Sequence, residues 1–497
     1  MAEYLHGAYG LINAVGNRTA DRSLGAIVYI GTAPVNQVEG GANYVNTPVL
    51  VSNIAEAKKY FGYSEDWASF TLCEAMYTHL EQKGVGPLVL INVFNPSTHK
   101  ASTKTSLSLT PANGRVTVPA AELVIVDTLT VASGQTAKVK GTDYEVSYNS
   151  TTRVLTISEL TPGALGTTAL TVEYYAATPA TVTAAQVIGS TDGYGTNTGI
   201  YAVKSVYQAT GMVPAFLAAP GWSDIPEVNT ALCDIAVKIN KHWDAYVFAD
   251  MPIVYDSTAV TMATAVTFKS AHGYNRENET VYFPMVLGTD GRHYHISTLA
   301  AANFQELMLD RDGIPYRSAS NTPAPVIQSL YLGESSLNKV IDDEVINECL
   351  NKNGIASAAF TGGRWVIWGA HSADYSQSAD RSIISVAETN RMMLYYLSND
   401  FQARRPISVD QPMTANDLET IVSEEQTRVD ALVKIGALLY GEVAVNATAM
   451  TDADIVNGDF SFSFNITTTP LAKSLTAIVN WTDTGFVTYF SNAAEEL

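Results

Sequence analysis

Two kinds of sequence pattern alternate along this chain, and together they exclude a fold built only from helices or only from strands. Residues 26–33 (AIVYIGTA) and 88–94 (LVLINVF) are short runs of apolar and β-branched residues, which predicts two buried strands. Between them, apolar residues recur at spacings of three to five over residues 54–80, which is typical of helices. Strand, helix and strand in this order predict a βαβ unit with a parallel strand pair.

The composition and residue pattern change near Pro96. From residue 98 to 179 the chain is rich in Thr, Ser and Val and alternates polar with apolar residues, as in Arg115–Val118. Turn signals such as Asn113–Gly114 recur, and helical periodicity is nearly absent. Short strands at regular spacing predict a β-sandwich inserted into the α/β region.

The α/β pattern returns near Val187. Residues 214–219 and 245–249 are predicted strands, and the segment between them carries helical periodicity with Ser223 as its N-cap. Residues 364–368 predict another strand.

The last part of the chain predicts two helices and then strands. The helices are Ser382–Phe401 and a longer one from Ala415 to about Tyr440, which Thr414 and Asp417 begin with a capping box. Alternating apolar residues then predict two antiparallel strands, 460–466 and 475–481.

The predicted fold class is therefore α/β plus all-β, with several domains, a mixed sheet, an inserted β-sandwich and extended arms at both ends. The expected divisions are an N-terminal arm at 1–23, an outer α/β domain in two parts at 24–96 and 188–353, the insert at 97–187, an inner domain at 354–484 and a C-terminal arm strand at 485–497. The insert is expected on an outer surface, because large insertions are tolerated where packing is absent.

The net charge of the chain argues against two classes of partner. The formal net charge is −20, so nucleic acid and anionic membrane surfaces are disfavoured, because both are bound through clustered Lys and Arg. Only 16% of residues are charged while 46% are hydrophobic. Such a composition excludes disorder and suggests that much of the surface is polar but uncharged or is buried against other copies.

Cysteines and termini point to cytosolic synthesis. The three cysteines, Cys73, Cys233 and Cys349, are far apart and form no C-x-x-C motif, which excludes a disulfide scaffold and a zinc knuckle. The first residues lack the basic and apolar regions of a signal peptide, and no apolar stretch approaches the length of a membrane span.

No motif indicates catalysis or cofactor binding. A phosphate-binding G-x-x-x-x-G-K-[ST] loop is absent, and the Gly-rich segment 191–199 has no Lys, so a plain loop is expected there. His293 and His295 would share one face of a strand, but no third metal ligand follows at a diagnostic spacing. We therefore expect no catalytic, cofactor or metal site.

Both ends of the chain carry a short apolar stretch beyond a polar linker: Tyr9–Val15 and Gly485–Phe490. A lone strand is unstable in water and needs a sheet edge, either of its own subunit or of a neighbour.

Several segments, in their order along the chain, resemble contractile phage tail sheath proteins and those of phage-tail-like bacteriocins. They are Gly7–Gly10 before a βαβ unit, Phe216–Ser223 before a helix and Ala249–Pro252, and Gly354–Ile355 before Arg364–Ala370. Of these, Ala219–Trp222 and Trp365–Ala370 are the most specific. The resemblance covers most of the chain apart from the insert.

The resemblance implies a structural protein, not an enzyme, that forms stacked hexameric rings around an inner tube and contracts to drive the tube through a cell envelope. The implied partners are other copies of the chain, the inner tail tube protein, and the baseplate and tail terminator proteins. The implied location is a virion or phage-tail-like particle. The residues implied in strand exchange between subunits are Tyr9, Leu11, Ile12, Val15, Phe460, Phe462, Phe464, Leu475, Val479, Trp481, Phe486, Val487, Tyr489 and Phe490.

The resemblance does not identify which residues contact the tube as clearly as it identifies the strand-exchange residues. Many sheath proteins carry a basic, aromatic-rich segment after the W-G-A motif, whereas Asp374–Glu388 here is mostly polar and neutral. Arg381, Arg391, Arg404 and Arg405 are the candidates for tube contact. Two alternatives of other classes remain: an enzyme on a doubly wound sheet, and a surface-layer or adhesion protein.

Overall fold

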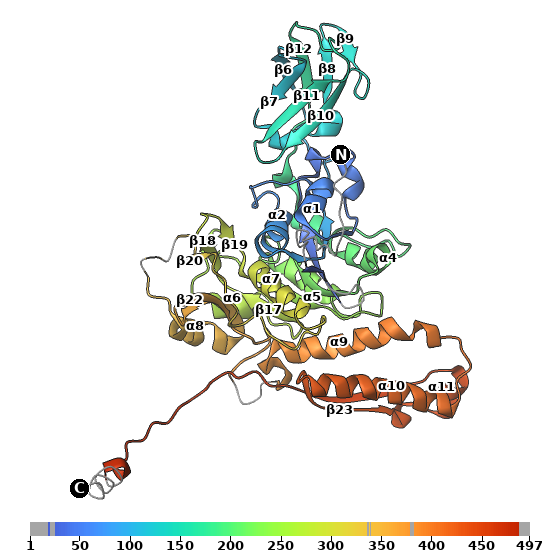
Figure 1. The fold of residues 1–497 in the computed structure, drawn as a ribbon, viewed down its shortest axis with the longest axis vertical. Helices are drawn as coiled ribbons and strands as arrows, with labels where there is room; N and C mark the ends of the chain where they lie inside the picture. The colour runs from blue at the N-terminus through green and yellow to red at the C-terminus, as the bar shows by residue number, and fades with distance from the viewer. Residues whose placement is uncertain (1–17, 20–24, 335–336, 338, 378–381, 487–497) are drawn as a thin grey trace, which may run out of the picture.

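The computed structural model describes the chain outside residues 1–17, 20–24, 335–336, 338, 378–381 and 487–497. Its centre is an eight-stranded mixed sheet (Figure 1). In spatial order the strands are β22 (Arg364–Trp368), β21 (Ile355–Thr361), β17 (Glu279–Tyr282), β14 (Tyr246–Asp250), β13 (Pro214–Ala218), β2 (Ala26–Gly31), β5 (Leu88–Asn92) and β3 (Val49–Val51). The six inner strands are parallel, and the edge strands β22 and β3 are antiparallel to their neighbours.

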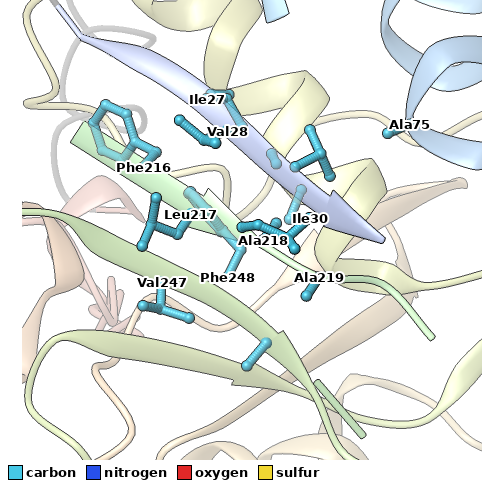
Figure 2. Packing of buried hydrophobic residues seen from close by; sticks show 14 of the residues in the cluster. Ile27, Val28, Ile30, Ala75, Phe216, Leu217, Ala218, Ala219, Val247 and Phe248 are labelled. Atoms are coloured by element: carbon cyan, nitrogen blue, oxygen red, sulfur yellow. The ribbon is translucent and has the colours of Figure 1, made fainter. Parts of the chain in front are cut away.

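Most residues of the inner strands are buried because helices cover the sheet. Every residue of β2, β5 and β14 is buried, as continuous apolar runs predict for parallel strands. Figure 2 shows buried side chains on three successive strands of the sheet: Ile27 and Val28 of β2, Leu217 of β13 and Phe248 of β14. The predicted βαβ unit and mixed α/β fold are confirmed.

Helices connect the strands of this sheet. They are α1 (Ile54–Phe61), α2 (Leu72–Ala75) with its π-helical continuation Met76–Lys83, α3 (Ala184–Ile188), α4 (Val206–Thr210), α5 (Pro226–Ile235), α6 (Ala265–Ala271), α7 (Ile296–Leu309) and α8 (Asp343–Cys349). A small sheet of β18 (Met285–Gly288), β19 (His293–Tyr294) and β20 (Ile327–Tyr331) lies beside them.

The insert forms two antiparallel sheets around a hydrophobic cluster of its own. One sheet contains β10 (Tyr144–Asn149), β11 (Val154–Glu159) and β7 (Arg115–Val118). The other contains β6 (Thr105–Leu109), β12 (Leu170–Tyr174), β8 (Thr130–Ser133) and β9 (Thr136–Lys138). Alternate residues such as Val116, Val118, Leu155 and Ile157 fill the space between them. In Figure 1 the insert stands at one end of the molecule.

Polar contacts hold the insert against the α/β region. The Asn36 amide nitrogen donates to the carbonyl oxygens of Glu122 (2.9 Å) and Val124 (3.1 Å). The Glu122 carboxylate accepts a hydrogen bond from the Ser64 hydroxyl. The two connections to the insert pair with each other, since Lys100 lies opposite Ala177 in an antiparallel bridge.

The opposite end of the molecule is a helical hairpin with a two-stranded sheet (Figure 1). It contains α9 (Glu388–Arg404), α10 (Ala415–Lys434), α11 (Asp452–Asn457), β23 (Leu438–Val445) and β24 (Phe462–Thr468). A third hydrophobic cluster, which includes Met393, Val429, Leu432, Leu438 and Val443, joins them.

Three sequence predictions need correction. The inner domain was expected to start at 354, but β21 and β22 complete the large sheet, because their apolar runs pair with β17 and with each other. The long helix ends at Lys434 and not near Tyr440, because Gly436 adopts φ +77° and turns the chain into β23. The first predicted helix of this region begins at Glu388 and not at Ser382.

Candidate assembly surface

A two-stranded sheet with an open edge forms the centre of this surface. β23 and β24 pair antiparallel from Leu438–Thr468 to Val445–Phe462, and within the described residues neither has another strand partner. The outer edge of β24 therefore presents a row of backbone donors and acceptors that a further strand can pair with. On the outer edge of β23, the Gln426 side chain of α10 already binds the Gly441 carbonyl oxygen (3.1 Å) and the Val443 N–H (2.8 Å). The sequence predicted β24 but missed β23. Gly436 followed by the alternation in LLYGEVAV is the signal that identifies it.

Close packing fixes this sheet on α10. A Cβ on Gly441 would lie 2.0 Å from Cγ1 of Val429, so only glycine lets β23 approach the helix this closely. On the neighbouring strand, Phe462 and Phe464 contact the ring of Phe401 on α9, with ring centroids 5.8 and 5.7 Å apart. Both helices thus hold the sheet, while the outer edge of β24 has no strand partner within the described residues.

Ion pairs join α9 to α10 beside this sheet. The carboxylate of Glu425, a buried residue of α10, lies 2.6 Å from a guanidinium nitrogen of Arg404 and also accepts hydrogen bonds from Arg405. Burial would raise the pKa of Glu425, but the hydrogen bonds from the two arginines outweigh burial and hold that pKa below its ordinary value. Arg404 also contacts Asp400 at 2.7 Å.

These pairs bear on the predicted tube contacts. Arg391 pairs with Glu277 at 2.5 Å, Arg405 with Glu424 at 2.9 Å, and Arg404 with the carboxylates above. Arg381 lies outside the described residues. Three of the four arginines therefore already bind carboxylates of their own subunit, and their contact with a tube stays a prediction.

The C-terminal segment beyond β24 leaves the body of the molecule (Figure 1). The Lys473 ammonium of this segment donates a hydrogen bond to the Tyr375 hydroxyl of the body at 3.1 Å. Beyond it, Leu475, Val479 and Trp481 are 90%, 91% and 81% exposed. Contiguous exposed apolar side chains of this size mark a surface that binds a partner.

This segment differs from the predicted strand 475–481. Residues 469–482 form neither helix nor strand, and β24 pairs with β23 instead. Phe460 lies just before β24, and Phe486 is helical with 59% exposure. Tyr9, Leu11, Ile12, Val15, Val487, Tyr489 and Phe490 lie outside the described residues. Strand exchange by all these residues stays a prediction.

The carboxyl edge of the large sheet is where an α/β enzyme would place its site. There the carboxylate of Glu74 accepts hydrogen bonds from the main-chain N–H and Nδ1 of His295, both at 2.7 Å, and Asp250 binds Ser297. Burial would lower the pKa of His295, but the Glu74 carboxylate outweighs burial and raises it to about 10. These polar groups bind one another across α2, β14 and α7.

The two histidines of the predicted strand point to different partners. His293 stacks on Tyr331 at 3.9 Å, whereas His295 precedes α7 and binds Glu74. In the part of the chain that the structure describes, no group of three or more His, Cys, Asp or Glu side chains could hold a metal ion. None of the described helices is long and apolar enough to cross a membrane.

Comparison with known proteins places the sequence beside a phage protein. The chain is 26% identical over 496 residues to the tail sheath protein of Burkholderia phage BcepMu, and the match covers 96% of each chain. No protein-family model matches the chain.

Solved structures give the same fold. A chain of the anti-feeding prophage baseplate has a TM-score of 0.53 at 13% identity, with 97% of this chain and all of that chain covered. A chain of the PVC sheath complex, an extracellular contractile injection system in its contracted state, has a TM-score of 0.52 at 11% identity, with 97% and 98% covered. The resemblance to contractile tail sheath proteins that the sequence indicated is confirmed.

Proposed function

We propose that this chain is the structural subunit of a contractile tail sheath. Copies polymerise into stacked hexameric rings around an inner tube, and contraction of the polymer drives the tube through a cell envelope. The observation that carries the proposal is the combination of an open-edged sheet, β23–β24, with an exposed apolar C-terminal segment on the same chain. The similarity to a tail sheath protein along 96% of the sequence supports it.

Strand exchange is the proposed link between subunits. The C-terminal segment of one copy adds to the open edge of the β23–β24 sheet of the next, and the N-terminal arm of another copy adds to the same sheet. Main-chain hydrogen bonds supply affinity, and pockets for alternate side chains supply specificity. A strand link of this kind stays connected while the bodies of the subunits move, which a contracting lattice requires.

The other proposed partners follow from this role. They are the inner tail tube protein, the baseplate and the tail terminator, and the subunit acts in a virion or phage-tail-like particle after synthesis in the bacterial cytoplasm. The chain performs no catalytic step and needs no cofactor in this role. The energy for movement comes from an extended lattice that is less stable than the contracted one.

Electron microscopy of the purified protein tests the proposal. Wild-type protein is expected to form tubes, whereas variants that lack residues 485–497 or 1–20, or that carry V479D and W481D, are expected to stay folded but to form no long tubes. V139D is the matched control, because Val139 is an exposed apolar residue of the insert. Long tubes from the C-terminal variants would exclude strand exchange, and wild-type protein that stays monomeric at high concentration would contradict the sheath function.

A further inference from the structure

A polar pocket of about 340 Å³ opens where the insert joins the α/β region. It lies just beyond the carboxyl end of β5, between the segment that enters the insert and the segment that follows it. Its lining carries no charged side chain. The polar side chains that line it are Asn46, Asn95, Thr98, His99, Gln186, Ser190 and Thr198.

Three amides in this wall have fixed orientations. The side-chain oxygens of Asn46, Asn95 and Gln186 accept main-chain N–H groups of Gly199 (2.8 Å), Ser97 (2.9 Å) and Thr183 (2.9 Å). A main-chain N–H can only donate, so each contact places the amide oxygen toward the backbone and leaves the NH₂ group on the other side. Within the described residues, no hydrogen bond engages any of these three NH₂ groups.

His99 forms part of the inner wall of the pocket. Its side chain is 6% exposed and stacks on Phe94, with ring centroids 5.8 Å apart. Nδ1 accepts the main-chain N–H of Asn95 at 3.1 Å, so the ring is neutral and its proton is on Nε2. That Nε2 is buried and has no partner among the described residues. Because this atom has almost no solvent-accessible surface, a molecule in the pocket does not reach it, and the donors left for such a molecule are the three amide NH₂ groups.

We propose that this pocket binds a carboxylate. A carboxylate accepts several hydrogen bonds and donates none, which matches the three unpaired NH₂ groups of residues that line one pocket. Hydrogen bonds to an ionised acceptor are also about twice as strong as neutral ones. A sugar or an alcohol would bring as many hydrogen-bond donors as acceptors. The amide oxygens are turned toward the backbone, so they do not accept hydrogen bonds from such donors. The carboxylate belongs either to a small organic acid or to an Asp or Glu side chain of a second copy.

Two isosteric substitutions test the proposal. Asn95→Asp and Gln186→Glu keep the oxygen that accepts from the backbone and replace the NH₂ donor by an anionic oxygen. Asn53→Asp is the matched control, because Asn53 also accepts a main-chain N–H, from Glu56 at 2.9 Å, but lies outside the pocket at the start of α1. All three variants carry the same change of charge.

The first measurement is calorimetric titration of unassembled protein with succinate and with its neutral diamide, succinamide. We expect succinate to bind wild type and N53D alike, at least tenfold more weakly to N95D and Q186E, and succinamide not to bind. This measurement does not depend on the proposed sheath function. Equal succinate binding by N95D and wild type, or equal binding of the diamide, would overturn the proposal.

The second measurement distinguishes the source of the carboxylate and rests on the proposed function. If succinate does not bind, N95D and Q186E are expected to raise the protein concentration needed for assembly at least fivefold relative to N53D, which identifies a side chain of a second copy. Absence of succinate binding together with unchanged assembly overturns the proposal. If the wild type forms no polymer, the sheath function fails and the succinate result alone decides on the pocket.

Discussion

The Glu425 carboxylate of α10 lies 2.6 Å from the guanidinium of Arg404 on α9. Only 1% of the Glu425 side chain is exposed, whereas Arg404 keeps 22% of its surface in solvent. This pair, with Arg405 beside it, ties the two long helices together next to the sheet that is proposed to accept strands from other subunits.

Removing the charge of Glu425 should therefore loosen the helical hairpin. E425Q is expected to lower the free energy of unfolding by about 2 kcal/mol, because it leaves two partly buried arginines with a weaker acceptor. Since the pKa of Glu425 is depressed, this contribution is present above pH 4.5 and is lost as the pH falls through the folded-state pKa. Urea denaturation at pH 7 measures the difference.

E424Q is the control, because the Glu424 side chain is 56% exposed, and it should cost less than about 0.5 kcal/mol. An equal loss in both variants would contradict the role of Glu425.

His79 should make the large domain sensitive to acid. It is fully buried, donates from Nδ1 to the Gln305 amide oxygen at 2.7 Å and accepts from the Tyr29 hydroxyl at 2.7 Å. Burial lowers its pKa to about 4 from 6.5. Between these values the unfolded chain binds a proton that the folded chain does not, so stability falls as the pH drops from about 6.5 to 4, by up to about 3 kcal/mol.

The pH dependence of thermal unfolding checks this prediction. H79N keeps a donor near Nδ1 and should flatten the slope between pH 6.5 and 4, at some cost in stability at pH 7. H242N, a change at an exposed histidine, should leave the slope as in the wild type. A slope that survives in H79N would assign the acid sensitivity to other groups.

Gly441 should tolerate no side chain. In G441A the added methyl group would meet Val429, and the expected loss is about 1–3 kcal/mol. V429A creates space at the same place, so the double variant should lose less than the sum of the two single variants. G485A, where a Cβ meets no atom within 4 Å, is the control. Additive losses would show that Gly441 and Val429 are not in contact.

Asn36 should control how firmly the insert is held. N36D replaces a donor by a charged acceptor that faces the carbonyl oxygens of Glu122 and Val124, so two hydrogen bonds are lost and repulsion is added. We expect faster limited proteolysis at the two connections of the insert and a larger radius of gyration, with little change at the exposed control N43D. Unchanged cleavage would indicate that the insert is held by other contacts.

Segments whose burial is evident from their own residues were predicted correctly, whereas segments whose packing partners lie elsewhere in the chain were not. β2 and β5 were identifiable because a strand buried on both faces must be a continuous apolar run. β23 was missed because its apolar residues continue the stripe of the preceding helix, and one glycine decides where the helix ends.

Residues 475–481 read as a strand, yet in the single chain they have no sheet to join. Their alternation of apolar and polar residues indicates that one face of the segment binds a partner surface. A local sequence pattern cannot show where that surface lies. The pairing of Arg404 and Arg405 with Glu425 was also hidden, because the residues are about twenty positions apart and meet only after α9 and α10 pack.

The adjacent connections of the insert have a practical consequence. Lys100 pairs with Ala177, and the Ala101 N–H donates to the Ala176 carbonyl at 2.8 Å, so the chain leaves and re-enters the α/β region at nearly one point. Since the insert also has its own core, evolution can delete or exchange it as a cassette without redesigning the rest. The same junction is a grafting point at which each copy in a polymer could display a foreign domain at regular intervals.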